Sequence, residues 1–440
     1  MAGPVLIFDK STLQSLNVDE SLWLDNSYLS NITPLFFVET LADLEKEPRT
    51  GRTPEQIVGN LAEKTPDMGS SLNAHHHGLI IGELLGIGKI DLRTGRPHLA
   101  GGKPVELQGR SGVMFGPSPE EEAFHRWQNG EFLEVERQAA KAWRRALGEI
   151  DLDGIYALFK ERLPQWNKPK NLDQVKVDVN TFISNADQEN VLRMGLAVIG
   201  ILEEVQRRVL ERWQAAGRPA ITEFAPYFTY VFSVDLFFYF GIAADLIGRG
   251  RASHKVDIAY LYYLPFCMVF SSNDKLHATL APFFMRPNQT FVSGIELKAD
   301  LQALDRHYDA LSDEEKDRGI MSFAFYPPDD STFLLTRLWD QYMNPGWREH
   351  KQDRNMAPYP REMHPDMKSL MDEIREKEKG SAPMKPLVSA ASTDEPDQIV
   401  VKRTVRARRG RWERFPPEVR NRPQNADGEF EDIPPDEGEK

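Results

Sequence analysis

Two acidic side chains directly follow short apolar segments of the chain. Residues 5–8, VLIF, end at Asp9, and residues 267–270, CMVF, lead into a polar stretch that ends at Asp274. Such segments are typical of buried strands in a parallel sheet. Because ligands bind beyond the carboxyl ends of parallel strands, we expect both acids at an edge where a site forms. Each could instead cap a following helix.

Two further acids lie near the starts of predicted helices that open at the same edge. Thr33 and Pro34 are typical of an N-cap and a first helical residue, and Glu39 follows in that helix. Asp257 begins a second helical segment. Carboxylates that converge repel one another unless cations lie between them, and their hard oxygens suit Mg²⁺ or Mn²⁺. The predicted metal ligands and catalytic residues are Asp9, Glu39, Asp257 and Asp274.

Four short motifs, in their order along the chain, resemble those of the PIN-domain family of nucleases. They are Asp-x-Ser after the first strand, a Glu in a helix after a strand-Pro junction, an Asp early in a helix with Ala two residues on, and a strand leading to Ser-x-Asp. The matching segments cover about residues 4–47 and 230–300. The residues that match are Asp9, Ser11, Pro34, Glu39, Asp257, Ala259, Ser272, Asn273 and Asp274.

The resemblance implies a parallel sheet flanked by helices and a divalent-metal-dependent activity that cuts RNA. It implies that Ser11, Ser272 and Asn273 support the four acids. RNA is the expected partner, single-stranded DNA is an alternative, and a homodimer is open because dimers are common in the family. The gap between Glu39 and Asp257 is several times the family's spacing, so a large insertion must lie between them.

The chain is therefore expected to be an α/β protein with a PIN-like core and a large, mainly helical insertion. Residues 187–216 are expected to form its longest helix, with one broad apolar face. The expected parts are 1–47, the first part of the core; 48–222, the insertion, mainly helical from 118; 223–300, the second part of the core; 301–375, a C-terminal helical appendage; and 376–440, a disordered charged tail.

Residues 224–248 are apolar over about the length of a membrane-spanning helix. Asp235 lies near their middle, and a carboxylate at the centre of a bilayer costs at least about 2.5 kcal/mol. We therefore expect a buried helix and no membrane contact. The single cysteine excludes an intramolecular disulfide. With no signal peptide at the N-terminus, we expect a cytoplasmic protein.

The net charge of −13 means that nucleic acid must bind through a local basic patch or through bound metal. A basic segment in the tail could contact an RNA backbone and stack on a base, or pair with acidic residues or a protein partner. Its candidate residues are Lys402, Arg403, Arg406, Arg408, Arg409, Arg411 and Trp412.

Several other residues carry weaker signals. Asp235 is an additional candidate ligand, and Lys10, beside Asp9, could contact a phosphate. The run His75-His76-His77 is interpreted as a polar loop because no paired ligand motif accompanies it. His277 is expected to be a surface histidine.

Two other functions remain open from the sequence. One is a haloacid-dehalogenase-like phosphohydrolase with Asp9 as nucleophile, although that family has a second Asp where Ser11 stands. The other is a non-catalytic PIN-like scaffold that binds RNA or protein.

Overall fold

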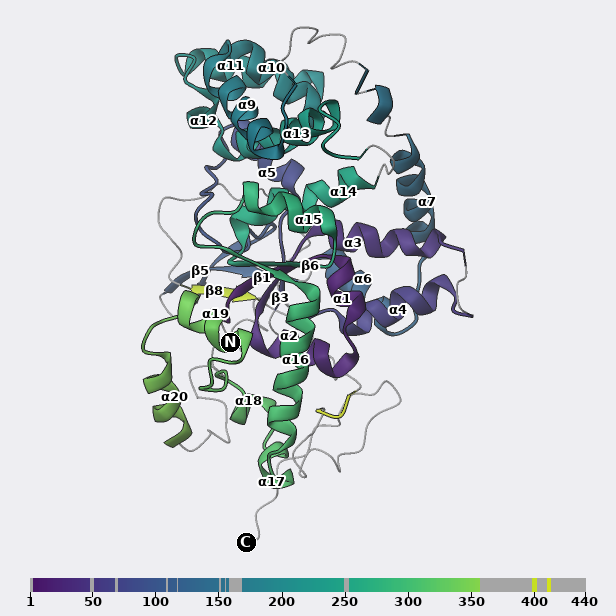
Figure 1. The fold of residues 1–440 in the computed structure, drawn as a ribbon, viewed down its shortest axis with the longest axis vertical. Helices are drawn as coiled ribbons and strands as arrows, with labels where there is room; N and C mark the ends of the chain where they lie inside the picture. Colours follow the sequence, from purple (N-terminus) through teal and green to yellow (C-terminus); the bar gives the residue numbers. More distant parts are fainter. Residues whose placement is uncertain are drawn as a thin grey trace.

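The computed structural model of the 440-residue chain describes residues 3–47, 51–67, 70–107, 110–116, 118–149, 152–154, 156–157, 168–248, 253–356, 398–401 and 410–412. At its centre is a five-stranded parallel sheet surrounded by helices (Figure 1). The strand order is β3-β2-β1-β6-β7. The expected α/β fold with a parallel sheet is confirmed. The strands are β1 (Val5–Phe8), β2 (Leu29–Ile32), β3 (Ser70–Leu72), β6 (Val269–Ser272) and β7 (Thr290–Ser293).

The helices of the described residues connect these strands and extend beyond the sheet. Thr33 caps α3 and Pro34 is its first residue, as the sequence predicts. The α-helices are α1 (Lys10–Ser15), α2 (Val18–Ser27), α3 (Pro34–Leu41), α4 (Pro54–Lys64), α5 (His76–Leu84), α6 (Pro119–Gln128), α7 (Glu134–Gly148), α9 (Leu172–Asn185), α10 (Gln188–Ile199), α11 (Glu203–Ala215), α12 (Ile221–Phe224), α13 (Pro226–Ala243), α14 (His254–Ala259), α15 (Lys275–Leu280), α16 (Gly294–Asp309), α17 (Asp313–Lys316), α18 (Ile320–Phe323), α19 (Leu334–Tyr342) and α20 (Trp347–Met356). Shorter 3₁₀ helices are η1 (Ala42–Glu45), η2 (Tyr260–Phe266) and η3 (Ala281–Phe283).

Strand β1 occupies the middle of the sheet and separates two hydrophobic cores. Val5 and Ile7 pack into one core, and Leu6 and Phe8 pack into the other. This division follows from the alternation of side chains along a strand. An apolar run without polar interruption is therefore what a strand buried on both faces requires.

The register of β1 with β6 aligns the polar residues that follow the two strands. Phe8 lies opposite Ser271, and the backbone N–H of Asp9 donates to the carbonyl of Ser271 at 3.2 Å. Strand β6 begins at Val269, two residues later than the predicted segment 267–270. Ser272 is consequently the last strand residue and lies beside Asp9.

The segment 48–222 contributes to the core sheet as well as to the surrounding helices. Its strand β3 pairs with β2 in parallel and forms one edge of the sheet. The prediction of a single helix over residues 187–216 is wrong. The segment forms two helices, α10 and α11, because Gly200, with a φ of +77°, ends α10 in the left-handed conformation that glycine favours.

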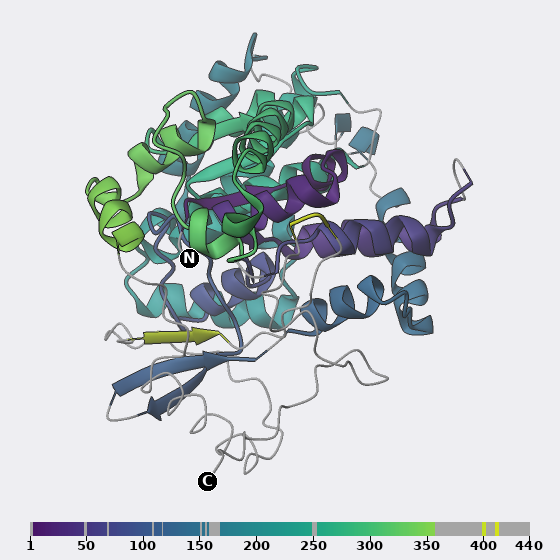
Figure 2. The same cartoon turned by 90° about the horizontal axis from the view of Figure 1, so that it is seen from below.

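A second, smaller sheet joins the segment 48–222 to the tail. Its strands are β4 (Lys103–Leu107), β5 (Arg110–Phe115) and β8 (Gln398–Val401), in the order β4-β5-β8. Figure 2 shows β8 alongside β5, apart from the core sheet. The rest of the predicted disordered tail, 376–440, lies outside the described residues, except for residues 410–412.

Helix α13 corresponds to the apolar segment whose length would allow it to cross a membrane. Of its 18 residues, 83% are buried inside the protein, which is the pattern of a core helix. The carboxylate of Asp235 is paired with Lys255 of α14 and accepts a hydrogen bond from Tyr262. A buried carboxylate with a cation and a hydroxyl donor is compatible with the protein interior.

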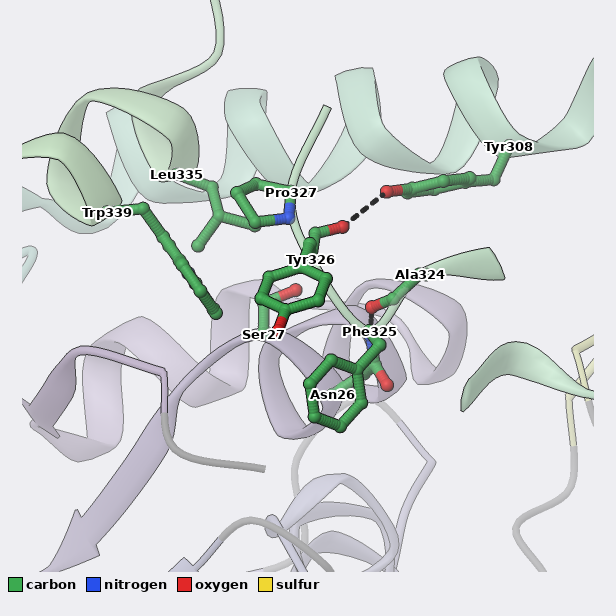
Figure 3. A pocket seen from close by; sticks show the side chains of 9 residues that line it. All are labelled: Asn26, Ser27, Tyr308, Ala324, Phe325, Tyr326, Pro327, Leu335 and Trp339. Carbon is green, nitrogen blue, oxygen red and sulfur yellow. Dashed lines mark hydrogen bonds between the residues drawn. The ribbon is translucent and has the colours of Figure 1, made fainter. Parts of the chain in front are cut away.

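The residues that follow β7 pack against the N-terminal part of the chain. The side-chain amide of Asn26, on α2, donates to the carbonyl of Ala324 at 2.8 Å (Figure 3). The hydroxyl of Tyr308, on α16, donates to the carbonyl of Tyr326 at 3.3 Å. The described part of the expected appendage is thus attached to the core by buried contacts.

Glu83 supplies the N-terminal cap that α13 lacks. The N-cap residue, Ala225, has no side-chain acceptor, and the carboxylate of Glu83 accepts the backbone N–H groups of Tyr227 (3.1 Å) and Phe228 (2.9 Å). Burial raises the pKa of Glu83 to about 7, against the opposing effect of these N–H groups.

Replacing Glu83 with alanine should lower the free energy of unfolding by about 2–3 kcal/mol, because it leaves two buried N–H groups without an acceptor. Chemical denaturation followed by circular dichroism measures the change. Glu204→Ala, at an exposed position in the first turn of α11, serves as the control. Equal stability of the two variants would contradict the assigned cap.

Candidate active site

Asp9 lies at the carboxyl end of β1 and is 5% exposed. One carboxylate oxygen, Oδ1, accepts the backbone N–H of Thr12 at 2.9 Å, which also caps α1. The other, Oδ2, accepts the hydroxyl of Ser272 at 2.7 Å. The hydroxyl of Ser11 lies within 2.8 Å of both oxygens. Because Ser11 has one proton, it satisfies only one oxygen at a time, and the other retains a free lone pair.

His277 is buried beneath this carboxylate, so the expectation of a surface histidine is wrong. It is 1% exposed, and its Nδ1 lies 3.5 Å from Asp9 Oδ2. Its Nε2 lies 2.6 Å from the backbone carbonyl of Asp257. His277 follows the N-cap of α15, Asp274, by three residues. This spacing places it in the first turn of a helix but does not indicate that it is buried.

The hydrogen bonds around Ser272 indicate the protonation of His277. Ser272 Oγ donates to the ionised Asp9 and accepts the backbone N–H of Asp274 at 2.9 Å. Its remaining lone pair faces His277 Nδ1 at 2.8 Å, so Nδ1 carries a proton. Nε2 also carries a proton, since a carbonyl can only accept. With Asp9 ionised, this arrangement fits a His277 that is protonated on both nitrogens.

The pKa directions agree with this assignment. Burial alone would raise the pKa of Asp9, but the hydrogen bond and positive charge of His277 and the Ser272 hydroxyl hold it below its ordinary value. Burial alone would lower the pKa of His277, but Asp9 and the backbone carbonyl of Asp257 hold it above its ordinary value. The pair is a buried carboxylate and its counter-cation.

Glu39, in α3, reaches the same region from the other side of β1. The hydroxyl of Tyr260 donates to its carboxylate. Burial raises the pKa of Glu39, while this hydroxyl and the charge of Lys10 oppose the rise. The Lys10 ammonium group donates to the backbone carbonyl of Glu39 at 2.9 Å and pairs with Asp43 at 2.5 Å. Lys10 thus anchors the helix that carries Glu39.

The pKa of Asp257, in α14, depends on its burial and on the charges of the other acids. Burial raises the pKa of Asp257 to about 7, and His277 opposes the rise. The negative charges of Glu39, Asp274 and Asp9 each raise it further. The pKa of Asp257 is thus raised by acids from three other parts of the chain, Asp9 after β1, Glu39 in α3 and Asp274 before α15.

Asp274 and Asn273 complete this edge. One carboxylate oxygen of Asp274 accepts the backbone N–H of Leu276 at 2.6 Å and so caps α15. The backbone N–H of Asn273 donates to Ser11 Oγ at 3.1 Å, and its side-chain amide donates to the Ser11 carbonyl at 3.4 Å. Asn273 therefore fixes Ser11, which in turn contacts Asp9. Both strand-end acids are helix caps as well as members of the acidic group.

The acidic group has the donor chemistry for Mg²⁺ or Mn²⁺, because its side chains present carboxylate oxygens, with the charge of His277 acting on Asp9 and that of Lys10 on Glu39. Asp9 also retains a free lone pair. Among the described residues, however, no three His, Cys, Asp or Glu side chains are gathered closely enough to hold a metal ion. Glu39 and Asp274 direct oxygens toward Tyr260 and Leu276, so cation binding would require these side chains to turn.

The remaining candidates lie elsewhere. Asp235 is paired with Lys255 and is absent from the charges that act on Asp257. His76 bonds the hydroxyl of Tyr263 at 3.1 Å, and His75 is the N-cap of α5, so this run begins a helix instead of the predicted loop. Arg411 and Trp412 contact α2 and α16. Lys402, Arg403, Arg406, Arg408 and Arg409 lie outside the described residues.

Comparisons with protein-family models, with curated proteins and with solved structures found no match to this chain. The geometry of the acidic edge is therefore the basis for assigning a function.

The raised pKa of Asp257 predicts how the stability of the metal-free protein, measured in EDTA, depends on pH. The folded state keeps a proton on Asp257 up to about pH 7, whereas the unfolded chain loses it near the ordinary value of 3.8. The free energy of unfolding contributed by this group therefore falls as the pH rises from about 4 to about 7. Asp257→Asn should remove the fall and stabilise the protein at pH 8 by about 1–3 kcal/mol.

Urea denaturation at pH 5 and at pH 8 measures the difference. Asp91→Asn, at an exposed position, is the control and should change neither value. If Asp257→Asn instead destabilises the protein at pH 8, burial and the neighbouring acids do not raise the pKa of Asp257 in the folded protein.

Proposed function

We propose that the protein is a divalent-metal-dependent endoribonuclease with a PIN-like core. The observation that supports the proposal is that Asp9 and Asp274 follow the paired strands β1 and β6, and that His277 joins Asp9 to the backbone of Asp257. This is the carboxyl edge of a parallel sheet, where such folds bind ligands. The order and motifs of the four acids are those that resemble the PIN family.

The four acids would hold Mg²⁺ or Mn²⁺. When bound, such an ion lowers the pKa of a water molecule and stabilises the oxygens of a phosphodiester under attack. The chain's own residues prepare the ligands. Ser11, Ser272 and His277 keep Asp9 ionised and oriented, and Asn273 fixes Ser11. A cation would replace the proton on Asp257, since both stabilise the same group of negative charges.

The proposal also includes the substrate, the cellular location and the oligomeric state. RNA follows from the resemblance to the PIN family, with single-stranded DNA as the second substrate to test. The net charge of −13 makes bound cations and the basic residues of the tail the points of contact with a phosphate backbone. A cytoplasmic location and a homodimer also belong to the proposal.

One observation favours a second candidate, a non-catalytic PIN-like scaffold. Within the described residues the acids are not gathered closely enough to hold a metal ion, and two of them serve as helix caps. The phosphohydrolase alternative has less support, because Ser11 occupies the position of the second acid and donates to Asp9.

Purified protein with Mn²⁺ should cut a mixture of labelled RNAs. Asp9→Asn and Asp274→Asn should each reduce the cleavage rate more than about 100-fold, because each removes a charged metal ligand. Asp91→Asn, which is exposed and distant from the acidic edge in the fold, should retain full activity. Gel electrophoresis of the products measures the rates, and circular dichroism verifies that each variant is folded.

A thermal shift on addition of Mn²⁺ separates the two candidates. The nuclease gains stability with Mn²⁺, and Asp9→Asn and Asp257→Asn lose that gain. A folded wild-type protein that shows no Mn²⁺ shift and cuts neither RNA nor single-stranded DNA would exclude the nuclease and leave the scaffold. Acid-stable labelling of Asp9 by a phosphate monoester would instead support the phosphohydrolase.

A further inference from the structure

The tripeptide Gly410-Arg411-Trp412 lies against α2 and α16, two helices that are distant from it in the sequence. Figure 1 shows it as the short yellow segment beside α16. Trp412 is 6% exposed and belongs to the same hydrophobic core as Leu6 and Phe8. A tryptophan from the basic segment is therefore buried in the protein and is not presented to solvent for stacking on a base.

The indole of Trp412 occupies an aromatic pocket with a polar end. Its ring meets Trp23 edge to face at 4.9 Å, and Phe323 lies on a further side at 6.1 Å. Its Nε1–H donates to Asp305 Oδ1 at 2.7 Å, and the Nε1–H of Trp23 donates to the same oxygen at 3.0 Å. Asp305 therefore marks the polar end of a site shaped for an indole.

Arg411 neutralises a group of carboxylates around this pocket. Its guanidinium pairs with Asp305, with Asp309 at 3.3 Å and with Asp19 at 3.7 Å. Its backbone N–H donates to Asp19 Oδ1 at 3.1 Å. Lys316 also pairs with Asp309, at 3.5 Å, whereas Arg411 is the cation that joins Asp19 to Asp305 among the described residues, so the pocket favours a positive side chain at this position.

Gly410 lies beside the same acid. A Cβ atom at this position would lie 2.9 Å from Asp19 Oδ1, the end of a side chain that can shift. The pocket therefore discriminates at two positions: by charge at Arg411, and by an aromatic cavity with an acceptor at Trp412.

We propose that this pocket is a peptide-docking site that recognises the sequence Arg-Trp, and that the chain's own tail is its ligand. The attachment is intramolecular, so a weak intrinsic affinity is sufficient to keep the pocket filled. The guanidinium is partly exposed, so salt weakens its ion pairs, whereas the indole contact persists. The proposal is independent of nuclease activity.

The test uses the full-length double variant Arg411→Ala/Trp412→Ala, whose pocket is vacated. A fluorescent peptide with the sequence of residues 404–415 should bind this variant, as measured by anisotropy. It should bind the wild-type chain at least about tenfold more weakly, because the attached segment competes. Peptides carrying Arg411→Ala or Trp412→Ala should each lose binding.

Two further variants of the double mutant identify the pocket. Adding Asp305→Asn should abolish peptide binding, and adding Glu314→Gln, at an exposed position on the neighbouring helix α17, should leave it unchanged. Binding that survives Asp305→Asn, or that is unchanged by the two peptide substitutions, overturns the proposal. Absence of binding to a folded double variant also overturns it.

A second measurement keeps the tail unaltered. In the wild-type chain, trypsin should cut after Arg411 slowly relative to its other sites, because the Arg411 side chain and backbone N–H are engaged. Asp305→Asn should speed this cleavage severalfold, as followed by mass spectrometry, and Glu314→Gln should not. An equal rate in all three proteins would show that the docked state is not the populated one.

Discussion

The buried carboxylate of Asp9, which is held in its ionised form, is the interaction on which the arrangement of the core depends. Asp9 keeps its charge because donors from α1 and β6 and the cation of His277 replace the water that burial removes. These donors lie in place only when β1 and β6 pair in the observed register. Strand pairing and the ionisation of Asp9 are therefore two aspects of one arrangement.

His277 connects this arrangement to the other half of the acidic edge. Through Ser272 it supports Asp9, and through Nε2 it holds the backbone of Asp257. Lys255, two residues before Asp257, pairs with Asp235 on the buried helix α13. Helix α14, which carries Asp257, is thus held at two points: Lys255 pairs with Asp235, and His277 binds the backbone carbonyl of Asp257. A loss of either contact would move a carboxylate that the proposed chemistry needs.

The segments outside the core are joined to it through charges as well as apolar contacts. Glu83 caps α13, and Arg411 neutralises acids on α2 and α16. The sequence predicts that the basic tail segment could contact nucleic acid. Two of its residues, Arg411 and Trp412, instead bind the protein itself. Basic residues near an aromatic residue suit either role, because a protein carboxylate and a phosphate attract the same guanidinium.

The sequence by itself determined the strands that end at Asp9 and near Asp274, the cap and proline that begin α3, and the buried character of α13. These depend on local periodicity, capping and the avoidance of unpaired buried charge, which are properties of neighbouring residues. Only the tertiary structure decided that His277 is buried, that Asp235 is paired with Lys255, that β3 joins the core sheet, and that Gly200 divides a predicted helix. Each of these depends on a partner far away in the chain, or on a backbone angle that an apolar pattern does not specify, and so no local pattern contains it.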